Sequence, residues 1–254
     1  MRNRSLYILV LLALAPFFSF GQHNADSLFV KGNAFYAKSQ YKEAADVYEQ
    51  LLTAGFQSAP LYFNLGNAYY KTDNISLAIL NYEKAYKLAP GDEDIRVNLQ
   101  LANNKIIDKI EAVPTFFLSN WWKGFLMVFS LQTWSILGVL LFSAGFLLLI
   151  LYLFAKVSAI KKITFYIGIA LIIVALISLV AANAQLRFFN SHHEAIVFNG
   201  TVNVKSAPGD SQKTLFVIHE GTKVKINQHE NEWIKIELPN GNIGWIEYKA
   251  VQVI

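Results

Sequence analysis

The sequence predicts a multidomain membrane protein with an all-α repeat domain, two transmembrane helices and a C-terminal all-β barrel. Three observations lead to this fold class: an internal repeat within residues 25–92, two long apolar segments between residues 123 and 187, and short alternating strands from residue 194 onward. The composition agrees, because 54% of the 254 residues are hydrophobic and only 16% are charged, whereas about a quarter of the residues in an ordinary soluble domain are charged.

Residues 1–21 are organised as a secretory signal peptide. Two arginines near the N-terminus precede an apolar run from Leu6 to Phe18, and the small residues Ser19 and Gly21 follow it. The run is shorter than the ~20 apolar residues that a membrane-spanning helix needs, which disfavours a membrane anchor. We therefore expect cleavage after Gly21 and export of the residues that follow.

A self-comparison of residues 25–92 shows a period of 34 residues. The recurring positions are Gly32 and Gly66, Asn33 and Asn67, Ala44 and Ala78, and Tyr48 and Tyr82, and the second copy ends with Ala85 and Pro90. This pattern resembles the tetratricopeptide repeat (TPR), a pair of helices with a small residue where they cross and a proline after the second helix. We expect repeats at 25–58 and 59–92.

A third helix is expected to cover the end of this stack, because two repeats alone leave an apolar face exposed. In residues 93–112 the apolar side chains Ile95, Leu99, Ala102 and Ile106 follow helical spacing with polar residues between them, which is typical of a capping helix. The predicted TPR domain therefore covers residues 22–115.

The first helices of TPR units line the inner surface of the stack, which predicts a groove for an extended peptide or protein segment. Carboxamides at Asn33 and Asn67 each offer a donor and an acceptor to a peptide backbone. The alternative is that asparagine here is a general feature of the repeat. The predicted TPR groove consists of Phe29, Asn33, Tyr36, Phe63, Asn67, Tyr70 and Lys71.

Two segments, 131–155 and 163–184, are long and apolar enough to be transmembrane helices. Both lack ionisable side chains, which a transporter or proton relay keeps within the membrane, so they are interpreted as an anchor. The loop 156–162 between them contains three lysines and no acid, which places it in the cytoplasm. The regions on either side of the hairpin are then both extracytoplasmic.

An aromatic-rich segment, 116–130, precedes the first span. We interpret it as interfacial, with Trp121, Trp122 and Trp134 at the depth of the lipid headgroups, where tryptophan is enriched. A single long tilted helix is the alternative.

Residues 190–254 are predicted to form a small closed or nearly closed β-barrel. The expected strands are 195–198, 201–205, 215–218, 223–227, 233–238 and 243–247, with an Asn240-Gly241 hairpin turn between the last two. The motifs Val202-Asn-Val-Lys-Ser-Ala-Pro208, Glu220-Gly-Thr-Lys-Val224, Trp233-Ile-Lys-Ile236 and Gly244-Trp-Ile246 resemble the bacterial SH3 (SH3b) domain.

The SH3b resemblance implies a module that binds cell-wall peptides or protein segments. Trp245 is the candidate residue of its binding face, because an indole ring offers a stacking surface. Trp233 lies within an alternating strand and is expected in the core.

No enzyme, metal site or cofactor site is predicted. Cysteine is absent, and the chain contains no phosphate-binding glycine loop, Gly-x-Ser-x-Gly elbow or His-Glu-x-x-His helix. His192 and His193 are interpreted as a polar linker. The net charge of +4 comes from lysines and arginines beside the apolar segments, which argues against a nucleic-acid partner.

The order of the modules, from signal peptide through TPR units and a two-helix anchor to the SH3b domain, resembles the BatE proteins of Bat aerotolerance operons. This resemblance implies an inner (cytoplasmic) membrane protein with both terminal domains in the periplasm. It also implies work with von Willebrand A-domain membrane proteins and a MoxR-type ATPase in envelope stress tolerance. The predicted function is an envelope scaffold that binds protein partners; the alternative is a cell-wall sensor that binds peptidoglycan through the SH3b domain.

Overall fold

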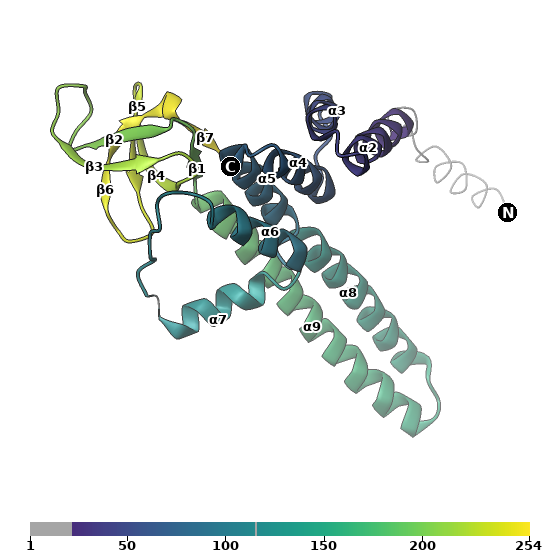
Figure 1. Cartoon of the computed structure of the whole chain (residues 1–254). Coiled ribbons are helices and arrows are strands. Elements are labelled where there is room, and N and C mark those ends of the chain that lie inside the picture. Colours follow the sequence, from purple (N-terminus) through teal and green to yellow (C-terminus); the bar gives the residue numbers. More distant parts are fainter. Residues whose placement is uncertain (1–21, 115) are drawn as a thin grey trace.

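The computed structural model describes residues 22–114 and 116–254; the predicted signal peptide lies outside them. Figure 1 shows a stack of helices beside a sheet, with a long helical hairpin extending away from both. The helices are α2 (Gln22–Ala37), α3 (Tyr41–Thr53), α4 (Ala59–Lys71), α5 (Ile75–Leu88), α6 (Glu93–Asn103), α7 (Phe117–Leu126), α8 (Leu131–Phe154) and α9 (Ser158–Ser191). The strands are β1 (Glu194–Val197), β2 (Thr201–Lys205), β3 (Thr214–His219), β4 (Lys223–Glu230), β5 (Trp233–Glu237), β6 (Ile243–Glu247) and β7 (Val251–Val253).

Helices α2–α5 form two helix pairs with the same internal packing. A Cβ atom added at Gly32 would lie 2.5 Å from the Tyr48 ring, and one added at Gly66 would lie 2.7 Å from the Tyr82 ring. Glycine at these positions therefore lets each first helix approach the tyrosine of the second. Ala78, also in this crossing, is fully buried.

Helix α6 packs against α5 and begins at a well-formed N-cap. The Asp92 carboxylate accepts hydrogen bonds from the backbone N–H groups of Asp94 and Ile95, which satisfies donors at the helix start. Ile95 and Ala102 are the buried residues of this helix. Val97 and Leu101, however, are each 47% exposed, so the exposed side of this helix is partly apolar.

Helices α8 and α9 form an antiparallel hairpin whose contact is built from small residues. A Cβ atom at Gly145 would lie 2.8 Å from the Gly168 carbonyl oxygen, and one at Gly138 would lie 2.6 Å from the Leu179 side chain. Close backbone approach through small residues is characteristic of helices that associate in membranes. Both helices are long and apolar enough to cross a membrane.

The turn between α7 and α8 is fastened to α9 by a buried glutamine. The Gln185 side-chain nitrogen donates to the carbonyl oxygens of Leu126 and Phe129, both at 3.0 Å. The Trp134 indole nitrogen donates to the same Leu126 carbonyl at 3.1 Å. Trp134 is consequently packed within the protein, whereas Trp121 is 65% exposed.

The loop between α5 and α6 contacts the turn between α7 and α8. A Cβ atom at Gly91 would lie 2.2 Å from the carbonyl oxygen of Val128. The end of the second repeat therefore touches the segment that leads into α8.

The C-terminal domain is one seven-stranded antiparallel sheet in the order β3-β2-β6-β5-β4-β1-β7. The expected Asn240-Gly241 turn is present, with Gly241 at φ +85° and its N–H donating to the Leu238 carbonyl. The prediction of a closed barrel is wrong, because β3 and β7 do not pair. Residues at the ends of these two strands contact the helical part of the chain instead. The backbone N–H group of His219, the last residue of β3, donates to Asp108, and the carbonyl oxygen of Ile254, after β7, accepts from Lys87.

Candidate binding surfaces

The two asparagines of the TPR groove are each held by a tyrosine of the same repeat. The Tyr48 hydroxyl donates to the Asn33 side-chain oxygen at 2.7 Å, and the Tyr82 hydroxyl donates to the Asn67 oxygen at 2.7 Å. Asn64 donates to the same Asn33 oxygen at 3.0 Å, which links the repeats. Within the described residues, the side-chain N–H groups of Asn33 and Asn67 make no hydrogen bond.

Burial keeps the tyrosine donors protonated. It raises the pKa of Tyr48 to about 12, with a smaller contribution from nearby Tyr36. Burial likewise raises the pKa of Tyr82 above its usual range. Both hydroxyls therefore donate at any physiological pH, so the asparagine oxygens serve as acceptors and the free amide N–H groups are directed to other partners.

The aromatic residues of the groove are half-buried rather than fully exposed. The Phe29 ring lies 6.0 Å from the Tyr48 ring, and the Phe63 ring lies 5.9 Å from the Tyr82 ring. The Tyr36 ring makes an edge contact with Tyr41 at 5.1 Å. Each phenylalanine thus packs on the tyrosine that orients the neighbouring asparagine and leaves part of its ring accessible.

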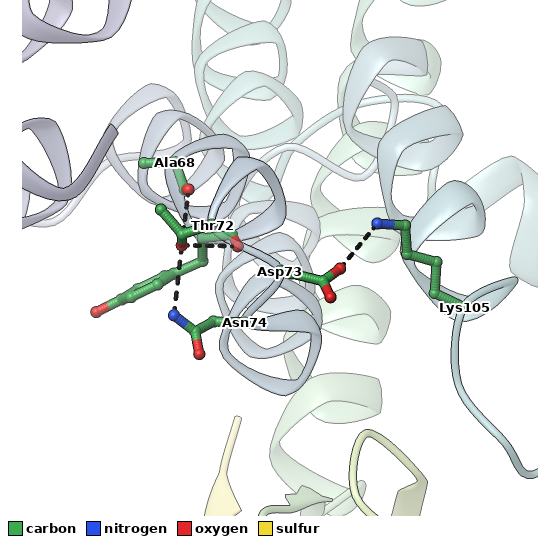
Figure 2. Close-up of polar contacts among 6 residues, drawn as sticks. Ala68, Thr72, Asp73, Asn74 and Lys105 are labelled. Carbon is green, nitrogen blue, oxygen red and sulfur yellow. Dashed lines mark hydrogen bonds and ion pairs between the residues drawn. The ribbon is translucent and has the colours of Figure 1, made fainter. Parts of the chain in front are cut away.

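A cluster of polar residues lies at the C-terminal ends of α4 and α6, beside the predicted groove residue Tyr70. Figure 2 shows Lys105 reaching toward Asp73, with a distance of 3.1 Å between Nζ and Oδ1. The same ammonium group lies 4.4 Å from the centre of the Tyr70 ring. Figure 2 also shows Asn74 donating to the Thr72 hydroxyl within the α4–α5 turn. Lys71, the predicted cation of the groove, is exposed.

Sequence reasoning overlooked three residues of this surface. Val97, Leu101 and Lys105 follow Phe63, Asn67 and Lys71 by one further period of 34 residues. Helix α6 therefore continues the register of the first helices, and its exposed Val97 and Leu101 extend the apolar part of the groove. Continuing the repeat by one unit was the signal that could have found them.

The TPR stack and the SH3b sheet are joined by ion pairs. Lys223 Nζ lies 3.0 Å from Glu83 Oε2 and 2.8 Å from Glu194 Oε2. Burial alone lowers the pKa of Lys223, but the two carboxylates outweigh it and raise the pKa above its ordinary value. The lysine therefore stays charged between two acids. Lys87 also donates to the Ile254 carbonyl at 2.8 Å.

Apolar residues continue this contact between the domains. Ile196 of β1 is fully buried in the same hydrophobic cluster as Ile79 of α5, and Phe198 and Ile254 pack against that cluster. The sheet therefore covers the second helix of the second repeat. This is the face that a further TPR unit occupies in a longer stack.

The two tryptophans of the SH3b domain are placed opposite to expectation. Trp245, on strand β6 between β2 and β5, is only 9% exposed. It therefore offers little stacking surface, and its assignment as the binding face is corrected. Trp233, expected in the core, is half-buried and lines a depression of about 260 Å³ together with Asn203 and Asp210. Within residues 22–114 and 116–254, no group of three or more His, Asp or Glu side chains is placed to hold a metal ion.

Comparisons with known proteins agree with this division. Residues 200–252 match the family model described as bacterial SH3 domain. Residues 32–73 match a TPR repeat model, and residues 59–92 match a tetratricopeptide repeat model. The chain thus combines TPR repeats with a bacterial SH3 domain, two kinds of module that typically bind other molecules rather than catalyse reactions.

One solved structure to which the chain is similar is the crystal structure of YrrB, described as a TPR protein with an unusual peptide-binding site. The identity is 20%, the match covers 67% of this chain and 76% of that one, and the TM-score is 0.32. This likeness is too low to extend to the arrangement of the site. A comparison with curated proteins finds no match.

Proposed function

We propose that the protein is a membrane-anchored envelope adaptor that binds an extended segment of a partner protein in the TPR groove. The observation that carries this proposal is the pair of unengaged amide donors at Asn33 and Asn67. Each is held in place by a buried tyrosine, so little side-chain freedom is lost when a peptide carbonyl accepts from it. Phe29, Phe63 and Val97 supply apolar contact alongside.

The proposal places α8 and α9 across the inner membrane, with residues 156–162 in the cytoplasm and both terminal domains in the periplasm. The lysines of this segment lie just before α9 and in its first two turns. The ion pair between Glu83 and Lys223, at 3.0 Å, supports this topology. Two residues in contact lie on the same side of a membrane, so the chain crosses it an even number of times between them. Two spans satisfy this condition, and the SH3b domain suits an extracytoplasmic location.

We further propose, from the resemblance to BatE proteins, that the partners belong to a Bat-type aerotolerance or envelope-stress system. Von Willebrand A-domain membrane proteins and a MoxR-type ATPase are the expected members. In this proposal the protein acts by binding, without catalysis and without a cofactor.

The test removes the two donors while keeping the two acceptors. Asn33→Asp combined with Asn67→Asp leaves an oxygen for each tyrosine and eliminates the amide N–H groups. Each lost hydrogen bond contributes about 0.5 to 1.5 kcal/mol, so partner affinity should fall by roughly ten-fold or more. The measurement is the recovery of partners, identified by mass spectrometry, when wild-type and variant proteins are purified from solubilised envelopes.

Two controls accompany this experiment. Gln50→Glu adds a negative charge on an exposed position of α3, outside the groove, and should leave recovery unchanged. Alanine at both asparagines removes the acceptors of buried tyrosines and should also lower stability, so it is the less selective variant. Equal recovery of the same partners with the double aspartate protein would reject the groove as the binding site.

The alternative function, a cell-wall sensor, is favoured by the depression beside Trp233. If that depression binds peptidoglycan, the purified full-length protein should sediment with isolated sacculi, and Trp233→Ala should abolish this while the double aspartate variant should not. Sedimentation that depends on Trp233, together with unchanged partner recovery by the double aspartate protein, would favour the sensor.

A further inference from the structure

A single carboxylate from the segment after α6 is bound by the SH3b domain as a ligand would be. Asp108 Oδ2 accepts hydrogen bonds from the His219 backbone N–H and from the Thr222 hydroxyl, both at 2.6 Å. The His219 ring nitrogen Nδ1 donates to Asp108 Oδ1 at 2.8 Å. Thr222 is only 2% exposed. Both carboxylate oxygens are therefore satisfied by donors of one turn, residues 219–222.

The neighbours of Asp108 alternate between contact with the SH3b domain and exposure. A Cβ atom at Gly221 would lie 2.4 Å from the Ile106 side chain, and Ile110 packs against the hydrophobic core of the sheet. Ile107, between them, is 67% exposed, and Lys109 is also exposed. Ile106, Asp108 and Ile110 thus contact the SH3b domain in the pattern Ile-x-Asp-x-Ile, and Ile106, which lies in a bend, also packs against the core of the helical domain.

This segment is held by side chains rather than by a backbone ladder. Residues 106–114 form no helix or strand. In the described part of the chain, one backbone-to-backbone hydrogen bond joins them to the SH3b domain. It runs from the Val113 N–H group to the Pro239 carbonyl oxygen, at 3.1 Å. Segments with few backbone bonds open locally at low free-energy cost. The ion pair of Lys223 with Glu83 and the hydrogen bond from Lys87 to Ile254 do not involve this segment, so we expect the domains to stay together when the segment leaves.

We propose that the turn 219–222 is a recognition site for an extended segment with a central carboxylate between two branched apolar residues, that residues 106–110 occupy it in the resting protein, and that an acidic segment of a partner protein displaces them. The complementary parts are three hydrogen-bond donors for the carboxylate and a glycine surface and the sheet core for the flanking side chains. The proposal does not rest on the function proposed for the TPR groove, although Lys105, which contacts Asp73 and Tyr70, directly precedes the segment.

The resident segment has a large advantage over any free competitor. A ligand tethered by a short linker acts at an effective concentration in the millimolar range. A free peptide of moderate affinity therefore occupies the site only when the resident segment is weakened or when the peptide is in large excess. This difference provides the test.

The experiment uses the full-length protein in detergent micelles and a fluorescent synthetic peptide with the sequence of residues 103–113. Three proteins are compared: wild type, Asp108→Ala, and Glu111→Ala, which removes the same charge from an exposed position of the same segment. The peptide should bind the Asp108→Ala protein at least about ten-fold more tightly than the other two. A peptide with asparagine in place of its aspartate should bind none of them.

A second readout keeps the proposal testable if the Asp108→Ala protein folds poorly. Trypsin cleavage after Lys109 of the wild-type protein should accelerate when excess unlabelled peptide is added, and the asparagine peptide should have no effect. Equal peptide binding by wild type and Asp108→Ala, or no binding by any protein, would overturn the proposal. Faster cleavage in Asp108→Ala without peptide binding would also overturn it, because the segment would then be a structural tie and nothing more.

Discussion

Buried tyrosines, rather than solvent, determine which atoms of the groove asparagines remain available. Asn33 and Asn67 are a predictable pair because they recur with the repeat, but their partners Tyr48 and Tyr82 follow them by 15 residues. Spacing alone does not reveal that hydrogen bond. The side-chain N–H groups of both asparagines therefore remain available, and in the proposed function they donate to backbone carbonyl groups of a bound segment.

Asp108 is the residue whose charge should set an acid limit on stability. Burial raises its pKa, but hydrogen bonds from Thr222 and His219 outweigh burial and lower the pKa below the ordinary value of 3.8. A carboxyl group with a lowered folded-state pKa stabilises the fold above its unfolded pKa, and the contribution is lost as pH falls through the folded pKa.

Asp108→Asn should therefore reduce the free energy of unfolding by about 1 to 2 kcal/mol at pH 7. The difference from wild type should persist down to about pH 4.5 and shrink below it. Urea unfolding of both proteins from pH 7 to pH 3 measures this. Because His219 faces the same carboxylate, the series is repeated with His219→Gln; a difference that vanishes by pH 6 in both backgrounds contradicts the assignment.

The tryptophans of the SH3b domain show where sequence reasoning ended at this scale. Trp233 alternates with the buried Ile234 and Ile236, so it lies on the opposite side of β5 from the core. Trp245 pairs with Lys235 of β5 and therefore lies on the same side of the sheet as Trp233. The sequence does not show what covers each ring, and this decides that Trp245 is buried whereas Trp233 is half-buried.

At the scale of elements, the existence of the helices and most strands could be predicted, but their extents could not. The second apolar segment ends near residue 184 by composition, yet α9 continues to Ser191. Nothing breaks the helix in between, and the side-chain N–H groups of Gln185 donate to carbonyl groups of the α7–α8 turn. Hydropathy indicates which part of a helix suits an apolar environment, but it does not show where the helix begins or ends.

The contact between α8 and α9 supplies a prediction with a matched control. Alanine at Gly145 places a methyl group 2.8 Å from the Gly168 carbonyl oxygen, whereas alanine at Gly124 of α7 meets no atom within 4 Å. Gly145→Ala should destabilise the hairpin by about 1 to 3 kcal/mol through overpacking.

Gly124→Ala should instead be neutral or stabilise by up to about 1 kcal/mol, because alanine favours a helix over glycine. Unfolding of the detergent-solubilised protein with increasing sodium dodecyl sulfate compares the two. Similar stabilities for both variants would show that α8 and α9 do not approach as closely as this contact requires.

At the scale of the whole molecule, the order of modules was predictable and their packing was not. The interface between the domains combines Glu83 of α5, Glu194 of β1 and Lys223 of β4, and residues drawn from such distant parts of the chain share no periodicity. The open sheet has contacts of the same kind. His219, at the end of β3, bonds to Asp108, and Ile254, after β7, accepts from Lys87, and no pattern within the SH3b residues indicates either contact.

The prediction at the scale of the whole molecule concerns the membrane topology of the chain. Reporter fusions after Ala112 and at Ile254 should be active outside the cytoplasm, and a fusion near Ala159 should be active inside it. Replacing Lys156, Lys161 and Lys162 together should weaken this orientation, because the positive-inside effect depends on the number of basic residues. Cytoplasmic activity of either terminal fusion would exclude the two-span arrangement.

Helix α9 connects the α8–α9 hairpin almost directly to the C-terminal sheet. Its 34 residues form a rod about 51 Å long at 1.5 Å per residue, longer than the ~30 Å hydrocarbon core. Only His192 and His193 separate this rod from β1. A rotation of the helix about its axis is therefore expected to turn the sheet with it. The orientation of the hairpin about its long axis would then set the direction in which the surfaces of the SH3b domain face.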